Sequence, residues 1–176
     1  DLAVREEEKN TSAALVRGVA ARIRELGYAL SGFDACVTST VLSGSGLSSS
    51  AAYETLVGNI LNHFCCGDAL DAITIAKIGQ FAENVYFGKP CGLMDQMGSS
   101  VGGVVFIDFA DPANPVVERV DYDFTKSGHA LCIVDTASSH GDLTDDYADI
   151  TREMGAVAAH FGKTVLREVP LASFQA

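Results

Sequence analysis

Three consecutive serines after a glycine-rich loop are the residues whose types and spacing are best suited to chemistry. Ser48, Ser49 and Ser50 follow the sequence Gly-Ser-Gly-Leu, which begins at Gly44, and an apolar helical pattern comes after them. Gly44 and Gly46 allow a tight turn and a close approach of the backbone to a ligand. Free N–H groups and the positive end of the dipole at a helix start favour an anion. The pattern fits an anion site or an ordinary serine cap, although a cap needs only one serine.

The loop differs from two common phosphate-binding sequences. No Gly-Lys-Ser or Gly-Lys-Thr follows its glycines, and the third glycine of a dinucleotide fingerprint is missing. The serine hydroxyls nevertheless supply donors for phosphate oxygens and a ligand type that Mg²⁺ accepts.

Asp95 is the second residue suited to chemistry, since it follows the turn that contains Pro90 and Gly92. A carboxylate in the first turn of a helix is stabilised by the helix dipole, which would explain Asp95 without any chemistry. A carboxylate placed beside a reacting hydroxyl also serves as a general base, worth about 10²- to 10⁴-fold in rate. From the sequence alone, Glu83 on the preceding predicted helix is expected to be a solvated side chain.

Together these sequences resemble the GHMP kinases, a family that includes galactokinase, homoserine kinase and mevalonate kinase. The run from Gly44 to Glu54 is similar to the second family motif, Pro-x-x-x-Gly-Leu-Ser/Gly-Ser-Ser-Ala, with Leu42 where the family usually has proline. Three serines are typical of the galactokinase members. The sequence Pro-Cys-Gly-Leu-Met-Asp-Gln, which contains Asp95, is similar to the galactokinase sequence around the catalytic aspartate. The stretch that contains His140 and Tyr147 is similar to a third galactokinase segment.

The resemblance implies a role for each matching residue. Asp95 would accept the proton of the sugar's anomeric hydroxyl, Gly92 would contact the sugar, and Tyr147 would orient it. Ser50 and Glu83 would hold Mg²⁺. The ATP phosphates would be bound by Gly44, Ser45, Gly46, Leu47, Ser48, Ser49 and Ser50.

The implied activity is transfer of the ATP γ-phosphate to galactose or a close sugar, which gives galactose 1-phosphate and ADP. Three alternatives remain: a non-catalytic sensor that binds galactose and ATP, a GHMP kinase for another sugar such as N-acetylgalactosamine or arabinose, and an unrelated acidic α/β domain. Asp145 and Asp146 replace the usual serine and glutamate before Tyr147, and Asp149-Ile-Thr-Arg replaces an arginine pair. These departures bear on the identity of the sugar more than on the type of reaction.

Two family motifs have no match in this sequence: Gly-Arg-x-x-x-x-Gly-Glu-His-x-Asp, which supplies a catalytic arginine, and a C-terminal Gly-x-Gly-x-Gly-Gly loop. We therefore expect an internal piece whose partners are the N- and C-terminal parts of the same polypeptide. Residues 1–176 alone are expected to show little turnover.

Apolar periodicity predicts a mixed α/β or α+β fold. The predicted helices lie at 5–26, with Gly27 as C-cap, at about 47–61, at 69–84, with Asp68 as N-cap, at 93–97 and at 144–161. The predicted strands lie at 32–41, 104–108, 116–120 and 130–134. The resemblance implies a GHMP-kinase-type fold with a ribosomal-protein-S5-like N-terminal half. Residues 1–100 would be part of the ATP-binding domain, and 101–176 would hold its end and the start of the C-terminal domain.

The formal net charge of −11 argues against nucleic-acid and membrane partners, because such a field repels phosphate backbones and anionic lipid. The expected partners are instead a small-molecule sugar and ATP. Five scattered cysteines without C-x-x-C spacing are typical of reduced, mostly buried thiols, so we expect a cytoplasmic protein.

Overall fold

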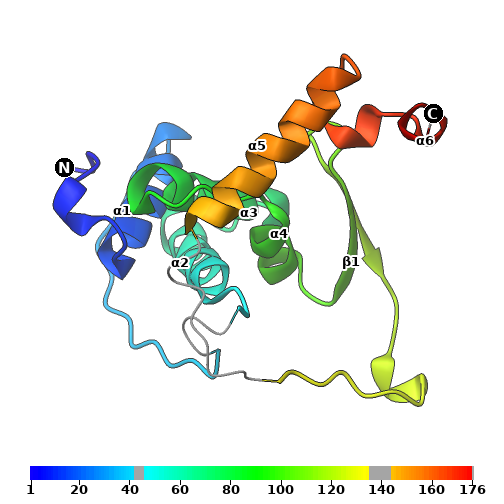
Figure 1. Ribbon diagram of the computed structural model, residues 1–176. Helices are drawn as coiled ribbons and strands as arrows, with labels where there is room; N and C mark the ends of the chain where they lie inside the picture. Colours follow the sequence, from blue (N-terminus) through cyan, green and yellow to red (C-terminus); the bar gives the residue numbers. More distant parts are fainter. Residues whose placement is uncertain (42–45, 135–143, 176) are drawn as a thin grey trace.

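The computed structural model describes residues 1–41, 46–134 and 144–175 and is built around a cluster of helices (Figure 1). The cluster holds α1 (Ser12–Glu25), α2 (Ser49–Cys66), α3 (Ala72–Phe81), the short π-helix η2 (Ala82–Phe87) that continues α3, and α4 (Met94–Val101). The remaining elements are η1 (Glu6–Glu8), β1 (Val104–Asp108), β2 (Val116–Val120), η3 (Phe124–Lys126), α5 (Thr144–His160), η4 (Leu166–Glu168) and α6 (Leu171–Phe174).

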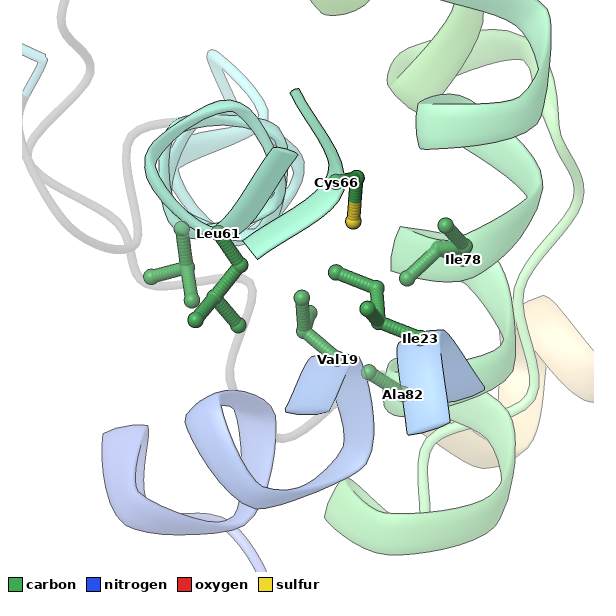
Figure 2. Close-up of a cluster of buried hydrophobic side chains, with 7 residues drawn as sticks. Val19, Ile23, Leu61, Cys66, Ile78 and Ala82 are labelled. Carbon is green, nitrogen blue, oxygen red and sulfur yellow. The ribbon is translucent and has the colours of Figure 1, made fainter. Parts of the chain in front are cut away.

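The largest hydrophobic core lies where α1, α2, α3 and η2 meet (Figure 2). The buried members are Val19, Ile23, Val57, Leu61, Cys66, Ile78 and Ala82. Each fully buried aliphatic side chain of this kind contributes about 1.5–3 kcal/mol, so the core fixes α2 and η2 relative to α1. Of the five free cysteines only Cys66 is buried, so the expectation of mostly buried thiols was wrong.

Helix ends follow local signals, with two corrections. The C-cap of α1 is Leu26 and not the predicted Gly27, which follows it with φ +95°, the conformation of a glycine that ends a helix. The predicted cap at Asp68 is wrong, because Asp68 has a left-handed backbone and α3 begins later. Asp71 caps α3 instead, since its carboxylate accepts a 2.7 Å hydrogen bond from the N–H of Thr74.

In the described residues β1 and β2 form an antiparallel pair, with Val104 opposite Val120 and Asp108 opposite Val116. This hairpin packs against α3 and α4 through apolar side chains that include Ile107 and Val117. The predictions of strands at 32–41 and 130–134 were wrong. Neither segment joins a ladder in the described part of the chain, and a β-branched sequence becomes a strand only when a partner supplies hydrogen bonds.

Helices and a small sheet confirm the predicted mixed α/β class. The division of the chain near residue 100 stays a prediction. Within the described ranges, no helix combines the length and apolar character that a membrane crossing requires.

Close packing of α1 on η2 depends on Gly18. A Cβ at this position would lie 2.7 Å from the Cα and Cβ of Ala82 and 3.0 Å from Cγ of Tyr86. Gly18→Ala should therefore lower the free energy of unfolding by about 1–3 kcal/mol, because the Cα of Ala82 is backbone and cannot turn away. Urea denaturation of the 176-residue chain measures the change.

Gly98→Ala is the matched control for Gly18→Ala. Gly98 lies within α4, and a Cβ there meets nothing within 4 Å. Because glycine weakens a helix interior, Gly98→Ala should leave stability unchanged or raise it by about 0.5–1 kcal/mol. Equal stability of the two variants would contradict the packing described here.

Candidate functional site

The three serines lie at the start of α2, as the sequence predicts. Ser48 adopts a left-handed backbone with φ 57° and ψ 44° directly before the helix, and its side chain makes no capping hydrogen bond. Ser49 and Ser50 form the first turn, where backbone N–H groups have no partner within the helix. Among the described residues the geometry argues against an ordinary serine cap at Ser48, and the start of α2 presents serine hydroxyls and backbone N–H groups.

One turn further along α2 begins a buried polar cluster. Glu54, Glu83 and Gln96 come from α2, η2 and α4 and are 1%, 2% and 1% exposed. The Nε2 group of Gln96 donates to Oε2 of Glu83 at 2.9 Å and to Oε2 of Glu54 at 3.2 Å. One amide therefore joins two carboxylates from different helices in the protein interior.

Burial changes the proton affinity of this cluster. Desolvation, followed by the charge of the nearby Glu83 carboxylate, raises the pKa of Glu54 from its ordinary value of 4.5 to about 8. Glu54 is thus mainly protonated at neutral pH, which limits the negative charge that the pair places in the interior. Burial also raises the pKa of the neighbouring Cys91 thiol well above its usual range, so this sulfur stays protonated.

Asp95 lies beside this cluster but faces the other way. It stands in the first turn of α4 next to the buried Gln96, while its own side chain is exposed. Gly92 precedes α4 and is also exposed, and a Cβ there would meet nothing within 4 Å. The start of α4 therefore offers a carboxylate near the positive end of a helix dipole, with open space before it.

The turn that leads into α4 is fixed by side-chain amides. Asn84 accepts a 2.7 Å hydrogen bond from the N–H of Cys91 and donates to the carbonyl of the same residue at 3.4 Å. Gln80 donates to that carbonyl at 3.2 Å. Gly88 ends η2 with φ +87°. These contacts determine where Gly92 and Asp95 lie relative to η2.

The donor chemistry of Ser50 and Glu83 fits a hard cation. Ser50 precedes Glu54 by one helical turn on the same face of α2, and Glu54 shares the amide of Gln96 with Glu83. In the described part of the chain, Oε1 of Glu54 and Oε1 of Gln96 are buried without a hydrogen-bond partner. Because Glu54 is mainly protonated, the carbonyl oxygen of Gln96 is the spare acceptor of the cluster. The ammonium of Lys89 lies 3.9 Å from Oε1 of Glu83.

Those oxygens do not by themselves complete a metal site. Over residues 1–41, 46–134 and 144–175, no group of three or more His, Cys, Asp or Glu side chains could hold a metal. A cation at Ser50 and Glu83 would need further oxygens, and Mg²⁺ typically takes these from phosphates and water.

The structure thus brings Glu83 into contact with Gln96, the residue after Asp95. Ser50 lies one helical turn before Glu54 on α2. The functional roles predicted for these residues stay predictions. Gly44 and Ser45 lie outside the described residues, as do Leu42 and His140 and the side chain of Tyr147. Gly46 has φ +74° and Leu47 is exposed. The apolar cavity of about 600 Å³ between α1 and residues 30–33 contains none of the predicted site residues that the structure describes.

Glu54 and Gln96 are site residues to which sequence reasoning assigned no role. A signal for Glu54 exists in the sequence: it falls on the same helical stripe as Ala51, Gly58 and Leu61, all of which are buried. A carboxylate on a buried stripe requires a polar partner from another element. Gln96 had no comparable signal, since its partners lie 13 and 42 residues away.

The comparison with protein families matches residues 14–103, about half of the chain, to the GHMP kinases N terminal domain. This range runs from the first turn of α1 to beyond the end of α4 and includes Glu54, Glu83, Asp95 and Gln96. The chain belongs to the GHMP kinase family. The expected family is therefore confirmed.

Curated relatives of this GHMP kinase chain are named galactokinase. The chain is 36% identical to that of Streptomyces coelicolor over 163 residues, which cover 90% of the chain and 41% of the relative. It is 36% identical to that of Streptomyces lividans over 162 residues, 90% of the chain and 40% of the relative. It is 34% identical to that of Actinobacillus pleuropneumoniae over 177 residues, which cover 96% of the chain and 43% of the relative. The chain thus spans about two fifths of the length of these relatives.

The raised pKa of Glu54 predicts how stability depends on pH. Between pH 4.5 and about 8 the folded chain keeps a proton on Glu54 that the unfolded chain releases. Because the folded state binds more protons, its free energy of unfolding falls as pH rises, by up to about 1.4 kcal/mol per pH unit. Glu54→Gln removes this titration, so urea denaturation from pH 5.5 to 8 should give a flatter profile for the variant.

Glu118→Gln serves as control for the pH profile, since Glu118 is an exposed carboxylate on β2. Its profile should run parallel to that of the unmodified chain. If Glu54→Gln also runs parallel, Glu54 does not hold a proton in the folded state.

Proposed function

We propose that the intact protein carrying this chain is a galactokinase-type sugar kinase, which transfers the γ-phosphate of ATP to the anomeric hydroxyl of galactose or a close sugar. The products are galactose 1-phosphate and ADP. Because the chain spans about two fifths of its relatives, the proposal concerns the intact protein and not residues 1–176 alone.

The observation that carries the proposal is the shared anchoring of two helix starts. The serine-rich start of α2 and the Asp95-bearing start of α4 belong to helices joined by the buried hydrogen bond between Glu54 and Gln96. Phosphoryl transfer requires mainly that phosphate, cation and nucleophile be held in fixed positions. A rigid link between a candidate phosphate loop and a candidate base meets this requirement.

In this proposal the loop from Gly44 to Ser50 binds the ATP phosphates through backbone N–H groups and serine hydroxyls. The start of α2 adds the positive end of a helix dipole, which matters in a chain with a formal charge of −11. Ser50 and Glu83 would hold Mg²⁺, which when bound neutralises phosphate charge. Gln96 keeps one oxygen of Glu83 occupied, so the carboxylate is presented in a fixed orientation.

Asp95 would accept the proton of the sugar hydroxyl as that oxygen attacks the γ-phosphorus. Its exposed carboxylate at the start of α4 is accessible to a sugar, and Gly92 leaves room for close approach. Tyr147 would orient the sugar from α5.

Asp95→Asn tests the base. The amide keeps the size of the side chain but cannot take a proton at neutral pH, so turnover of the intact protein should fall by about 10²- to 10⁴-fold. Affinity for Mg²⁺-ATP should stay within about twofold, because the phosphate-binding groups lie on α2. Sugar-dependent ADP release measures turnover, and displacement of a fluorescent nucleotide measures affinity.

Asp121→Asn is the matched control, since Asp121 is an exposed carboxylate that follows β2. This variant should match the unmodified protein in both measurements. Undiminished turnover in Asp95→Asn would rule out Asp95 as the base.

A further inference from the structure

The amide of Gln96 is a junction between the three elements that carry the candidate site. Its Nε2 group donates to Glu83 on η2 at 2.9 Å and to Glu54 on α2 at 3.2 Å, while Gln96 itself belongs to α4. All three side chains are at most 2% exposed, so no solvent competes for these bonds. Breaking them would leave buried carboxylate oxygens without partners, which is costly in the interior.

The surrounding packing makes room for this junction. A methyl group at Gly79 of α3 would lie 3.1 Å from Cβ and Oε2 of Glu54 and 3.3 Å from Cγ of Gln96. Contacts this short are unusual for a Cβ, so the absence of a side chain at Gly79 leaves the space in which the carboxylate and the amide meet. The amide is therefore held by shape as well as by hydrogen bonds.

Apolar contacts fix α4 against only part of its surroundings. Met97 and Leu93, which are 0% and 7% exposed, pack with Ala76 of α3 and with the β1–β2 hairpin. The hydrogen bonds of Gln96 in turn fix the position of α4 relative to α2 and η2. Since Asp95 directly precedes Gln96, the anchoring of Gln96 also restrains the backbone at Asp95.

We propose that Gln96 is a positioning residue, which sets Asp95 and Glu83 relative to the phosphate-binding start of α2. This inference rests on the proposed kinase function and adds a residue to it. Gln96 touches neither sugar nor nucleotide in this account. It acts through the two residues that its amide and its backbone hold in place.

Removal of the Gln96 amide should affect kcat and the Mg²⁺ requirement selectively. In Gln96→Met the side chain keeps its length but loses both donors, so Asp95 shifts and Glu83 loses a partner. We expect kcat to fall about 10- to 100-fold, as for other residues that orient reacting groups or metal ligands. The Mg²⁺ concentration for half-maximal turnover should rise severalfold, while KM for ATP stays within about twofold.

If Gln96 had only a structural role, its loss would lower stability without a selective effect on catalysis. A variant of Asn62 serves as the control for such a loss of stability. Asn62 is another buried amide, 5% exposed, which donates to the carbonyl of Leu70 and accepts from its N–H, both at 3.0 Å. It lies near the C-terminal end of α2, two helical turns beyond Glu54. Asn62→Leu should lower the melting temperature about as much as Gln96→Met but leave kcat and the Mg²⁺ requirement unchanged.

The experiment uses the intact protein with Mg²⁺-ATP and galactose, and it also measures fluorescent-nucleotide affinity against Mg²⁺ concentration. Gln96→Asn, which keeps an amide on a shorter side chain, replaces Gln96→Met if the latter fails to fold. Unchanged kcat and Mg²⁺ dependence, or equal losses in Asn62→Leu, would overturn the inference.

Failure of the proposed function would give a different pattern from failure of this inference. If the unmodified protein transfers no phosphate to sugar, the proposed function fails, and the Mg²⁺ dependence of nucleotide affinity in Gln96→Met still decides the role of Gln96. Absence of any Mg²⁺-dependent nucleotide binding in the unmodified protein would overturn both.

Discussion

Two carboxylates and one amide, buried together between α2, η2 and α4, form the constraint on which the rest of the structure depends. Burial of Glu54 and Glu83 is unfavourable unless their oxygens are paired, and the amide of Gln96 serves both. The three elements must therefore keep fixed positions relative to one another, and the lack of a side chain at Gly79 of α3 leaves the space in which Glu54 and Gln96 meet. A high pKa on Glu54 reduces the cost by keeping one member of the pair neutral. The exposed start of α4 and the serine-rich start of α2 project from this fixed centre, which is why a fold with little sheet still offers a defined arrangement of functional groups.

Elements governed by neighbouring residues could be predicted from the sequence. The serine-rich start of α2, the short helix after Leu93 and the strands at 104–108 and 116–120 all appear where the pattern placed them, because glycine turns and apolar spacing are local signals. Family membership could also be predicted from two short motifs, around Ser48 and around Asp95, because the two rarely occur together outside this family.

Features that depend on distant partners could not be predicted. The β-branched segments at 32–41 and 130–134 have strand-like sequences but join no ladder among the described residues, since pairing is decided elsewhere in the chain. Glu54 meets Gln96 across 42 residues, and no local pattern reports such a contact. Asp68 and Asp71 are both plausible caps by type, and the backbone conformation decides for Asp71.

The kinase account is tested most directly by ADP release from the intact protein with Mg²⁺-ATP across a panel of free hexoses and pentoses. The account predicts release that depends on sugar and is strongest with galactose or a sugar that differs from it at one position. If no sugar in the panel stimulated ADP release, the account would be contradicted. If galactose still bound under those conditions, the protein would be a sensor that uses the same scaffold without transferring phosphate.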